Sequence, residues 1–155
     1  MIQLDEIDCK ILNTLQQEGR ISILDLAEEV GLSPTPCARR VKRMEDEGII
    51  QGYAAVLNPR ALGVHLDVFV NVRLRSSTRE AIDIFEGAIQ SMPEVVECYL
   101  VTGNYDYLVH LRVTDIDDFK SFVRERLSSI ASVGETVSSI ALEQTKHTTS
   151  IALPF

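Results

Sequence analysis

The spacing of apolar residues changes once along this chain of 155 residues, and the change divides it into two parts. In the first fifty residues, apolar side chains recur every three or four positions, as on one face of an amphipathic helix. From Leu66 to Leu74 they alternate with polar residues, the pattern of a half-buried strand. We therefore expect an α+β protein with a helical N-terminal part and a mixed C-terminal part.

Three helix starts occur within the first forty residues. Each has an apolar residue, then a capping residue, then an apolar residue five positions after the first, which is a hydrophobic staple around an N-cap. The capping residues are Asp5, Ser22 and Ser33. Asp8 and Asp25 stand at the third helical position of the first two helices, as in a capping box. The pattern predicts three short helices.

A short turn separates the second and third helices. It contains Gly31, and Ser33 then caps a helix whose first turn holds Pro34 and Pro36, where a missing N–H costs little. Two short helices joined by a turn with glycine are typical of a helix-turn-helix unit.

The outer face of the third helix is basic. Residues 34–43 carry four cations and no acid, whereas the 33 residues before them carry two basic and seven acidic residues. With Cys37, Val41 and Met44 toward the core, the cations lie on the solvent side. A solvated charged face is the alternative interpretation, but the position within a helix-turn-helix favours DNA. The net charge of −8 argues against non-specific coating of nucleic acid.

Residues 48–57 form an extended stretch closed by Asn58-Pro59, typical of a wing or a linker strand. After it the expected order is strand, helix, strand, strand, helix, strand, which is the ferredoxin-like βαββαβ pattern. Gly103-Asn104 suits a tight hairpin. The expected elements cover residues 66–74, 82–92, 95–102, 105–113, 115–127 and 137–143.

Both helices of this pattern must pack on one face of the sheet. The other face then holds Phe69, Tyr99 and Leu108 among polar neighbours, too apolar a surface to leave in water. We expect a dimer through that face.

Catalytic constellations are not found in the sequence. Its eight glycines form no G-x-G phosphate loop, and its three histidines are far apart. Three widely spaced cysteines offer no metal knuckle, and their apolar-periodic positions predict buried thiols. We expect no enzyme activity, no catalytic or metal site and no cofactor. Short apolar runs and an acidic N-terminus favour a cytoplasmic protein without a membrane span.

Two motifs carry a resemblance to a known family. Residues 30–37, VGLSPTPC, and residues 102–107, TGNYDY, are similar to the Lrp/AsnC (feast/famine) transcription regulators, in the branch of the leucine-responsive regulator. The resemblance covers nearly the whole chain. It implies a winged helix-turn-helix, a linker strand and a ferredoxin-like domain of the RAM type that forms dimers and often octamers.

The resemblance also implies double-stranded DNA and a free amino acid as partners, with no membrane. It places DNA contacts on Ser33, Thr35, Arg39, Arg40, Lys42 and Arg43. Of these, Arg39 is the best candidate for a base-edge contact in the major groove.

A site for a small amino-acid effector is implied around the predicted hairpin and the last strand. Its residues are Leu100, Gly103, Asn104, Tyr105, Asp106, Ser138, Ser139 and Ile140. Asp106 can accept from an ammonium, and the N–H groups of the turn can hold a carboxylate. A plain hairpin turn is the alternative interpretation of the same residues.

The expected domains are a DNA-binding domain (1–50), a linker (51–63), an effector and oligomerisation domain (64–146) and a tail (147–155). The expected function is a sequence-specific transcription regulator whose assembly responds to the effector. An amino-acid-binding regulatory subunit that acts through protein partners without DNA is the alternative, and the basic third helix favours the regulator.

Overall fold

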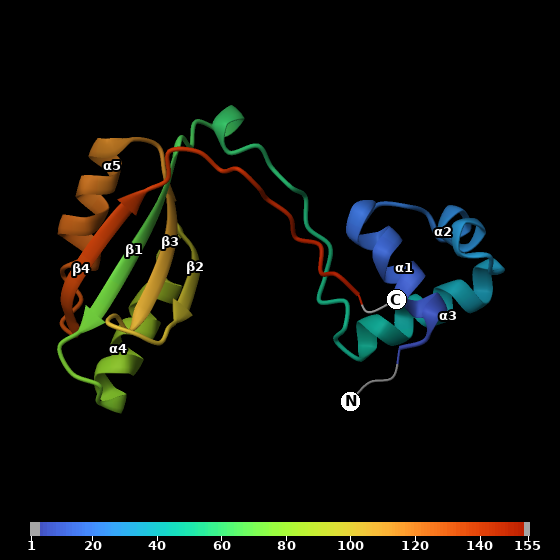
Figure 1. The fold of residues 1–155 in the computed structure, drawn as a ribbon, viewed down its shortest axis with the longest axis horizontal. Helices are drawn as coiled ribbons and strands as arrows, with labels where there is room; N and C mark the ends of the chain where they lie inside the picture. The colour runs from blue at the N-terminus through green and yellow to red at the C-terminus, as the bar shows by residue number, and fades with distance from the viewer. Residues whose placement is uncertain (1–3, 154–155) are drawn as a thin grey trace. The chain divides into compact units, whose positions relative to one another are not determined.

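The computed structural model describes residues 4–153, so the first three residues of the predicted 1–50 domain and the last two of the predicted tail lie outside it. Contacts group the chain into two compact units. One contains the chain up to Val56 together with the segment from Lys146, and the other is Leu57–Thr145. The first unit thus includes the predicted tail as far as it is described. Figure 1 shows the elements of both units.

Three helices form the first unit: α1 (Glu6–Gln17), α2 (Ile23–Val30) and α3 (Pro34–Asp46). A full capping box joins Asp5 and Asp8, and Ser22 caps α2 by accepting from the N–H of Asp25. The prediction for Ser33 is wrong in one respect: it is the N-cap of α3 by position, but its side chain makes no cap hydrogen bond. The two prolines that follow leave fewer N–H groups in that first turn to cap.

The predicted apolar stripes meet in one core. Its buried residues are Ile11, Leu12, Leu26, Ala27, Val30, Cys37, Val41 and Met44. Gly31 ends α2 in the left-handed region, at φ 72°, which lets the chain turn sharply into α3. The helix-turn-helix geometry therefore follows from one glycine and three short amphipathic helices.

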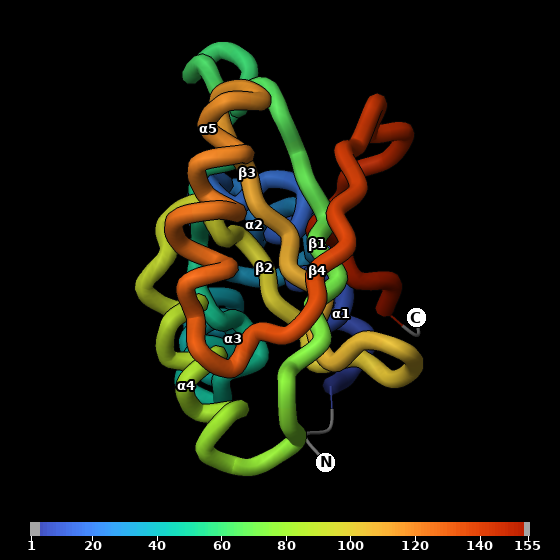
Figure 2. The backbone as a smooth tube through the Cα atoms, turned by 90° about the vertical axis from the view of Figure 1, so that its left-hand side faces the viewer, coloured from blue at the N-terminus to red at the C-terminus, as the bar shows by residue number. Residues whose placement is uncertain are grey.

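A four-stranded antiparallel sheet forms the second unit, in the order β2-β3-β1-β4. Its elements are η1 (Arg60–Leu62), β1 (Leu66–Leu74), α4 (Arg79–Gln90), β2 (Val95–Leu100), β3 (Tyr107–Val113), α5 (Ile116–Ser121), the π-helical η2 (Phe122–Leu127) and β4 (Val133–Ile140). Figure 2 shows α4 and α5 on the same side of the sheet. The predicted ferredoxin-like α+β fold is confirmed.

Residues on alternate positions of β1 and β3 point to the helices and form the core of this unit. Val68, Val70 and Val72 from β1 pack with Phe85 from α4 and Leu127 from η2. The opposite face of the sheet carries no helix in the described part of this unit, as the alternation of β1 predicts (Figure 1).

Three predictions about this unit are wrong in detail. The tight Gly103-Asn104 hairpin is a longer loop over residues 101–106, and the last strand is Val133–Ile140 instead of 137–143. Cys98 is exposed rather than buried because it lies on the edge strand β2, whereas Cys9 and Cys37 are buried. Separately, residues 48–57, which the sequence predicts as an extended wing or linker strand, form no strand in the structure.

Candidate functional site

The outer face of α3 is the first candidate site. Cys37, Val41 and Met44 are buried, so α3 turns its other side to solvent. Of the six residues predicted to contact DNA, all except Arg40 are exposed, and Arg40 is half-buried. The structure thus places this set on one accessible surface.

Two of its arginines are held by acids of α1. Asp8 is only 1 % exposed, and its two oxygens accept from Arg40 Nη1 at 2.8 Å and Arg43 Nη2 at 2.5 Å. Arg40 Nη1 also lies 2.6 Å from Asp5 Oδ2. The N–H of Asp8 and the Arg40 guanidinium lower the pKa of Asp5. These four residues, Asp5, Asp8, Arg40 and Arg43, are called the α1–α3 clamp below.

The α1–α3 clamp changes the charge that α3 presents. Lys42 is also paired, with Asp46 at 2.6 Å. Within residues 4–153, Arg39 is therefore the cation of α3 that has no ion pair. From the sequence, Asp5 and Asp8 are predicted as capping residues alone, because their ion pairs with α3 depend on how the two helices pack, which no local pattern reports.

The loop 101–106 is the second candidate site, and the end of β1 anchors it. Asp106 donates its N–H to Val72 O at 2.9 Å, and its carboxylate Oδ2 accepts from the N–H of Leu74 at 2.7 Å. Between these two contacts, Arg73 Nε donates to Asn104 O at 2.8 Å. Three successive residues of β1 thus hold the loop, and within residues 4–153 Asp106 Oδ1 accepts no hydrogen bond.

The predicted residues of β4 do not meet this loop within one chain. Ser138 pairs with Val70 and Ile140 with Val68, whereas the loop is held at residues 72–74. Since a strand rises about 3.3 Å per residue, Ser138 lies about 10 Å along the ladder from Arg73. The β4 residue paired with Arg73 is Glu135, 3.2 Å away in an ion pair. Sequence reasoning missed both, because a strand arginine and a strand glutamate are ordinary surface residues until their register is known.

The helix-free face of the sheet combines a polar network with apolar side chains. His110 is 7 % exposed, lies 2.7 Å from Asp67 and 3.3 Å from Glu97, and stacks on Phe69. Burial opposes ionisation of Asp67, but hydrogen bonds from Arg112 and His110 outweigh it and lower the pKa of this carboxyl.

Apolar side chains flank this network. Tyr99 and Val137 lie on the same face as Glu97 and Ser139 and are 52 % and 42 % exposed. This face therefore offers both a hydrophobic surface and fixed charges to a partner.

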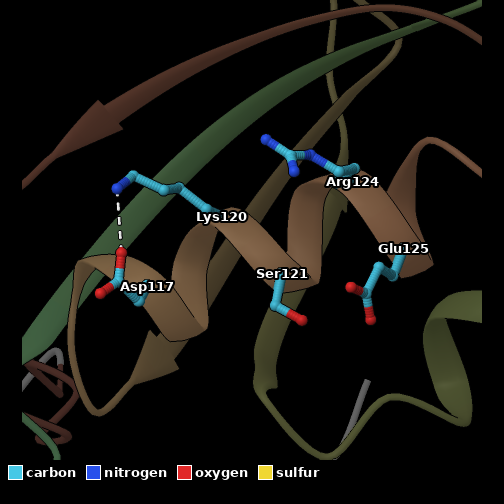
Figure 3. Close-up of a pocket in the computed structure, with 5 residues that line it drawn as sticks. All are labelled: Asp117, Lys120, Ser121, Arg124 and Glu125. Carbon is cyan, nitrogen blue, oxygen red and sulfur yellow. Dashed lines mark hydrogen bonds and ion pairs between the residues drawn. The ribbon is translucent and has the colours of Figure 1, made fainter.

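A shallow surface pocket along α5 and η2 is lined by Asp117, Lys120, Ser121, Arg124 and Glu125 (Figure 3). Its lysine is paired with Asp117 at 2.9 Å. None of the predicted site residues lies there. In the described part of the chain no group of three or more His, Cys, Asp or Glu residues is arranged to hold a metal ion, and no helix is long and apolar enough to cross a membrane.

Two family models match the chain, one in each unit. Residues 4–51 match the family model described as a winged helix-turn-helix DNA-binding domain, and residues 67–151 match the Lrp/AsnC ligand binding domain. The first match contains α3, and the second contains the loop 101–106 and β4.

Relatives that match nearly the whole chain point to the same family. The chain is 43 % identical over 150 residues to the leucine-responsive regulatory protein of Haemophilus influenzae, covering 97 % of this chain and 90 % of that protein. Its Escherichia coli counterpart is 41 % identical, with 97 % and 92 % covered.

Two solved structures are similar over nearly the whole chain. A transcriptional regulator from Neisseria meningitidis in complex with L-methionine superposes with a TM-score of 0.95 at 41 % identity, covering 98 % of both chains. A feast or famine regulatory protein from M. tuberculosis, also complexed with L-methionine, has a TM-score of 0.88 at 31 % identity, with 96 % of this chain and 99 % of that one covered.

Proposed function

This chain belongs to the Lrp/AsnC family of DNA-binding transcriptional regulators, in the branch of the leucine-responsive regulator, and from this premise we propose which residues read DNA and which bind the effector. The proposal about DNA contacts rests on the α1–α3 clamp. In this proposal Arg39, Ser33 and Thr35 contact base edges or phosphates directly. Arg40 and Arg43 are held by acids of the clamp and lie at the surface of the DNA groove.

DNA binding is tested on a duplex that the protein itself selects from a random-sequence pool. Arg39→Ala is expected to weaken binding at least tenfold and to reduce the slope of log K against log salt by about one. Lys10→Ala is the matched control, since Lys10 is an exposed cation on α1 that forms an ion pair with Glu6 of the same helix. Equal affinities for Arg39→Ala and Lys10→Ala would exclude Arg39 as a DNA contact.

The effector is, in our proposal, a small free amino acid. Asp106 Oδ1 accepts from its ammonium, and the N–H groups of Gly103 to Tyr105 hold its carboxylate. Leu100, 70 % exposed, and Ile140, 38 % exposed, supply apolar surface for its side chain. L-methionine in two related structures supports this ligand class.

The effector binds, on this proposal, between copies of the chain. Ser138, Ser139 and Ile140 lie about 10 to 17 Å along the ladder from Arg73, which holds the loop of their own chain, so a site that uses both sets draws on two subunits. A ligand at such a contact favours one assembly over another by its differential affinity, and the assembly decides how recognition helices are spaced on DNA.

A thermal-shift measurement with each of the twenty L-amino acids tests the ligand class. Stabilisation by at least one, with Asp106→Asn abolishing the shift, is the expected result. Because Asp106 also accepts from the N–H of Leu74, ligand-free Asp106→Asn must first be shown to unfold at a comparable temperature. If no amino acid shifts the midpoint of the unmodified protein, the effector proposal is wrong and the DNA proposal stands.

A further inference from the structure

The side chain of Arg73 contacts the loop 101–106 as well as the neighbouring strand β4. Its Nε donates to Asn104 O at 2.8 Å, its guanidinium carbon lies 5.2 Å from the centre of the Tyr105 ring, and its Nη1 lies 3.2 Å from Glu135. One side chain therefore touches two neighbouring residues of the loop and a residue of β4. Within its ladder Arg73 already pairs with Glu135 through the backbone register.

The position of Arg73 on the sheet makes these contacts possible. Val72 and Leu74 point into the core and are at most 8 % exposed, so Arg73 between them points to the helix-free face. The loop 101–106 extends on that side of the sheet, away from α4 and α5 (Figure 2). A long planar cation at this position can reach over the strand to the loop and the neighbouring strand at once.

At Gly134 the backbone of β4 lies close to the end of β1. A Cβ at Gly134 would lie 3.2 Å from Arg73 O and 3.3 Å from Arg75 N, and the β1–β4 register shifts at Arg73 and Leu74. The close approach places Glu135 beside Arg73. The loop, the end of β1 and the start of β4 thus meet around one guanidinium.

We propose that Arg73 is a positioning residue of the amino-acid site: it holds the Asn104–Tyr105 segment so that the loop N–H groups converge on the ligand carboxylate. This inference rests on the proposed function of the loop. The orientation of the peptide at Asn104 decides where the neighbouring N–H groups point, and the hydrogen bond from Arg73 to Asn104 O sets that orientation. A loop that is already ordered loses less conformational entropy when the ligand binds.

Substitution of Arg73 separates the hydrogen bond from the charge. Arg73→Met removes both, whereas Arg73→Lys keeps the charge beside Glu135 but lacks the planar group that donates to Asn104 and stacks on Tyr105. Calorimetric titration with L-methionine, or with whichever amino acid gives the largest thermal shift, is expected to show affinity lowered about tenfold or more in both variants.

Arg75→Met is the matched control. Arg75 lies two positions farther along the same chain and also donates from Nε to a backbone oxygen, Val133 O at 2.9 Å, but in the described part of the chain none of its hydrogen bonds reaches the loop. Its ligand affinity should stay within about twofold of the unmodified protein, and the ligand-free unfolding midpoints of all three variants are compared alongside.

Hydrogen exchange of the ligand-free protein is measured in addition to ligand affinity. Hydrogen exchange at the amides of residues 102–105 should accelerate in both Arg73 variants and not in Arg75→Met, because the side chain of Arg73 contacts Asn104 and Tyr105 whereas that of Arg75 bonds to Val133. If Arg73→Met binds the ligand as tightly as the unmodified protein, the positioning role is wrong. If Arg73→Lys alone binds as tightly as the unmodified protein, the charge of Arg73 explains its effect and the positioning role is again wrong. Failure of every amino acid to bind the unmodified protein overturns the proposed function first and this inference with it.

Discussion

Gln16 and Ile151 are 135 positions apart, yet they are joined by two hydrogen bonds. Gln16 Nε2 donates to Ile151 O at 3.2 Å, and the N–H of Ile151 donates to Gln16 Oε1 at 2.5 Å. Leu153, two residues on, packs against the core of the three helices. The segment around Ile151 and Leu153 thus packs on the helices of the DNA-binding unit.

Gln16→Leu is expected to lower the free energy of unfolding of the first unit by about 1 kcal/mol, because two exposed hydrogen bonds to Ile151 are lost and replaced by bonds to water. Urea unfolding followed by circular dichroism at a helical wavelength measures the change. Gln17→Leu is the control, since Gln17 is exposed on the same helix. If both substitutions cost the same, the contact with Ile151 adds no stability.

Asp8→Asn should destabilise the first unit more strongly, by about 1 to 3 kcal/mol. A buried carboxylate paired with two guanidinium groups is lost, but the arginines are 27 % and 42 % exposed, so solvent screens part of the cost. Urea unfolding measures this change as well.

The DNA affinity of Asp8→Asn separates two roles of the α1–α3 clamp. If Asp8 only neutralises the arginines, freeing them should tighten binding and steepen its salt dependence; if it positions them, binding weakens. We expect weaker binding under conditions where the variant is fully folded. Tighter binding would contradict the positioning role.

Replacing two exposed side chains of the helix-free face should weaken self-association. Tyr99→Lys with Val137→Lys puts like charges on a surface that we expect to meet its own copy, and both residues are exposed enough to leave the fold intact. Sedimentation velocity at micromolar concentration is expected to show a smaller species. Ile116→Lys, at an exposed position that starts α5, is the control. A monomeric unmodified protein would refute the dimer at the outset.

The stability of the second unit should fall above pH 10. Burial of Tyr107 and its hydrogen bond to Glu86, 2.7 Å long, raise the pKa of the phenol well above its usual value near 10. The unfolded chain releases this proton first, so stability is complete below pH 10 and declines as pH rises, by at most about 1.4 kcal/mol per pH unit. Denaturant unfolding between pH 9 and 11 should show a shallower decline for Tyr107→Phe, and an identical decline would contradict this assignment.

Local patterns predict helices and strands well where the residues that determine the element all lie within one short segment. The alternation from Leu66 to Leu74 matches β1 residue for residue, and the staples at Asp5 and Ser22 mark true helix starts. The hairpin at Gly103-Asn104 was wrong because its loop is held by β1, a strand about thirty residues earlier that no local signal reports. Similarly, β4 begins four residues before its predicted start, since its pairing with Leu74 extends it.

By itself, the sequence determined the two-part architecture, the helix-turn-helix and the outward basic face of α3, because the periods 3.6 and 2 and the capping residues act over a few neighbours. Only the tertiary structure decided which charges remain available. It paired Arg40 and Arg43 with acids 32 to 35 positions away and placed Arg73 between a loop and β4. Such contacts depend on how elements pack and on strand register. Burial of the core decides both, and the core is formed by residues from many segments, so no short stretch of sequence predicts these contacts.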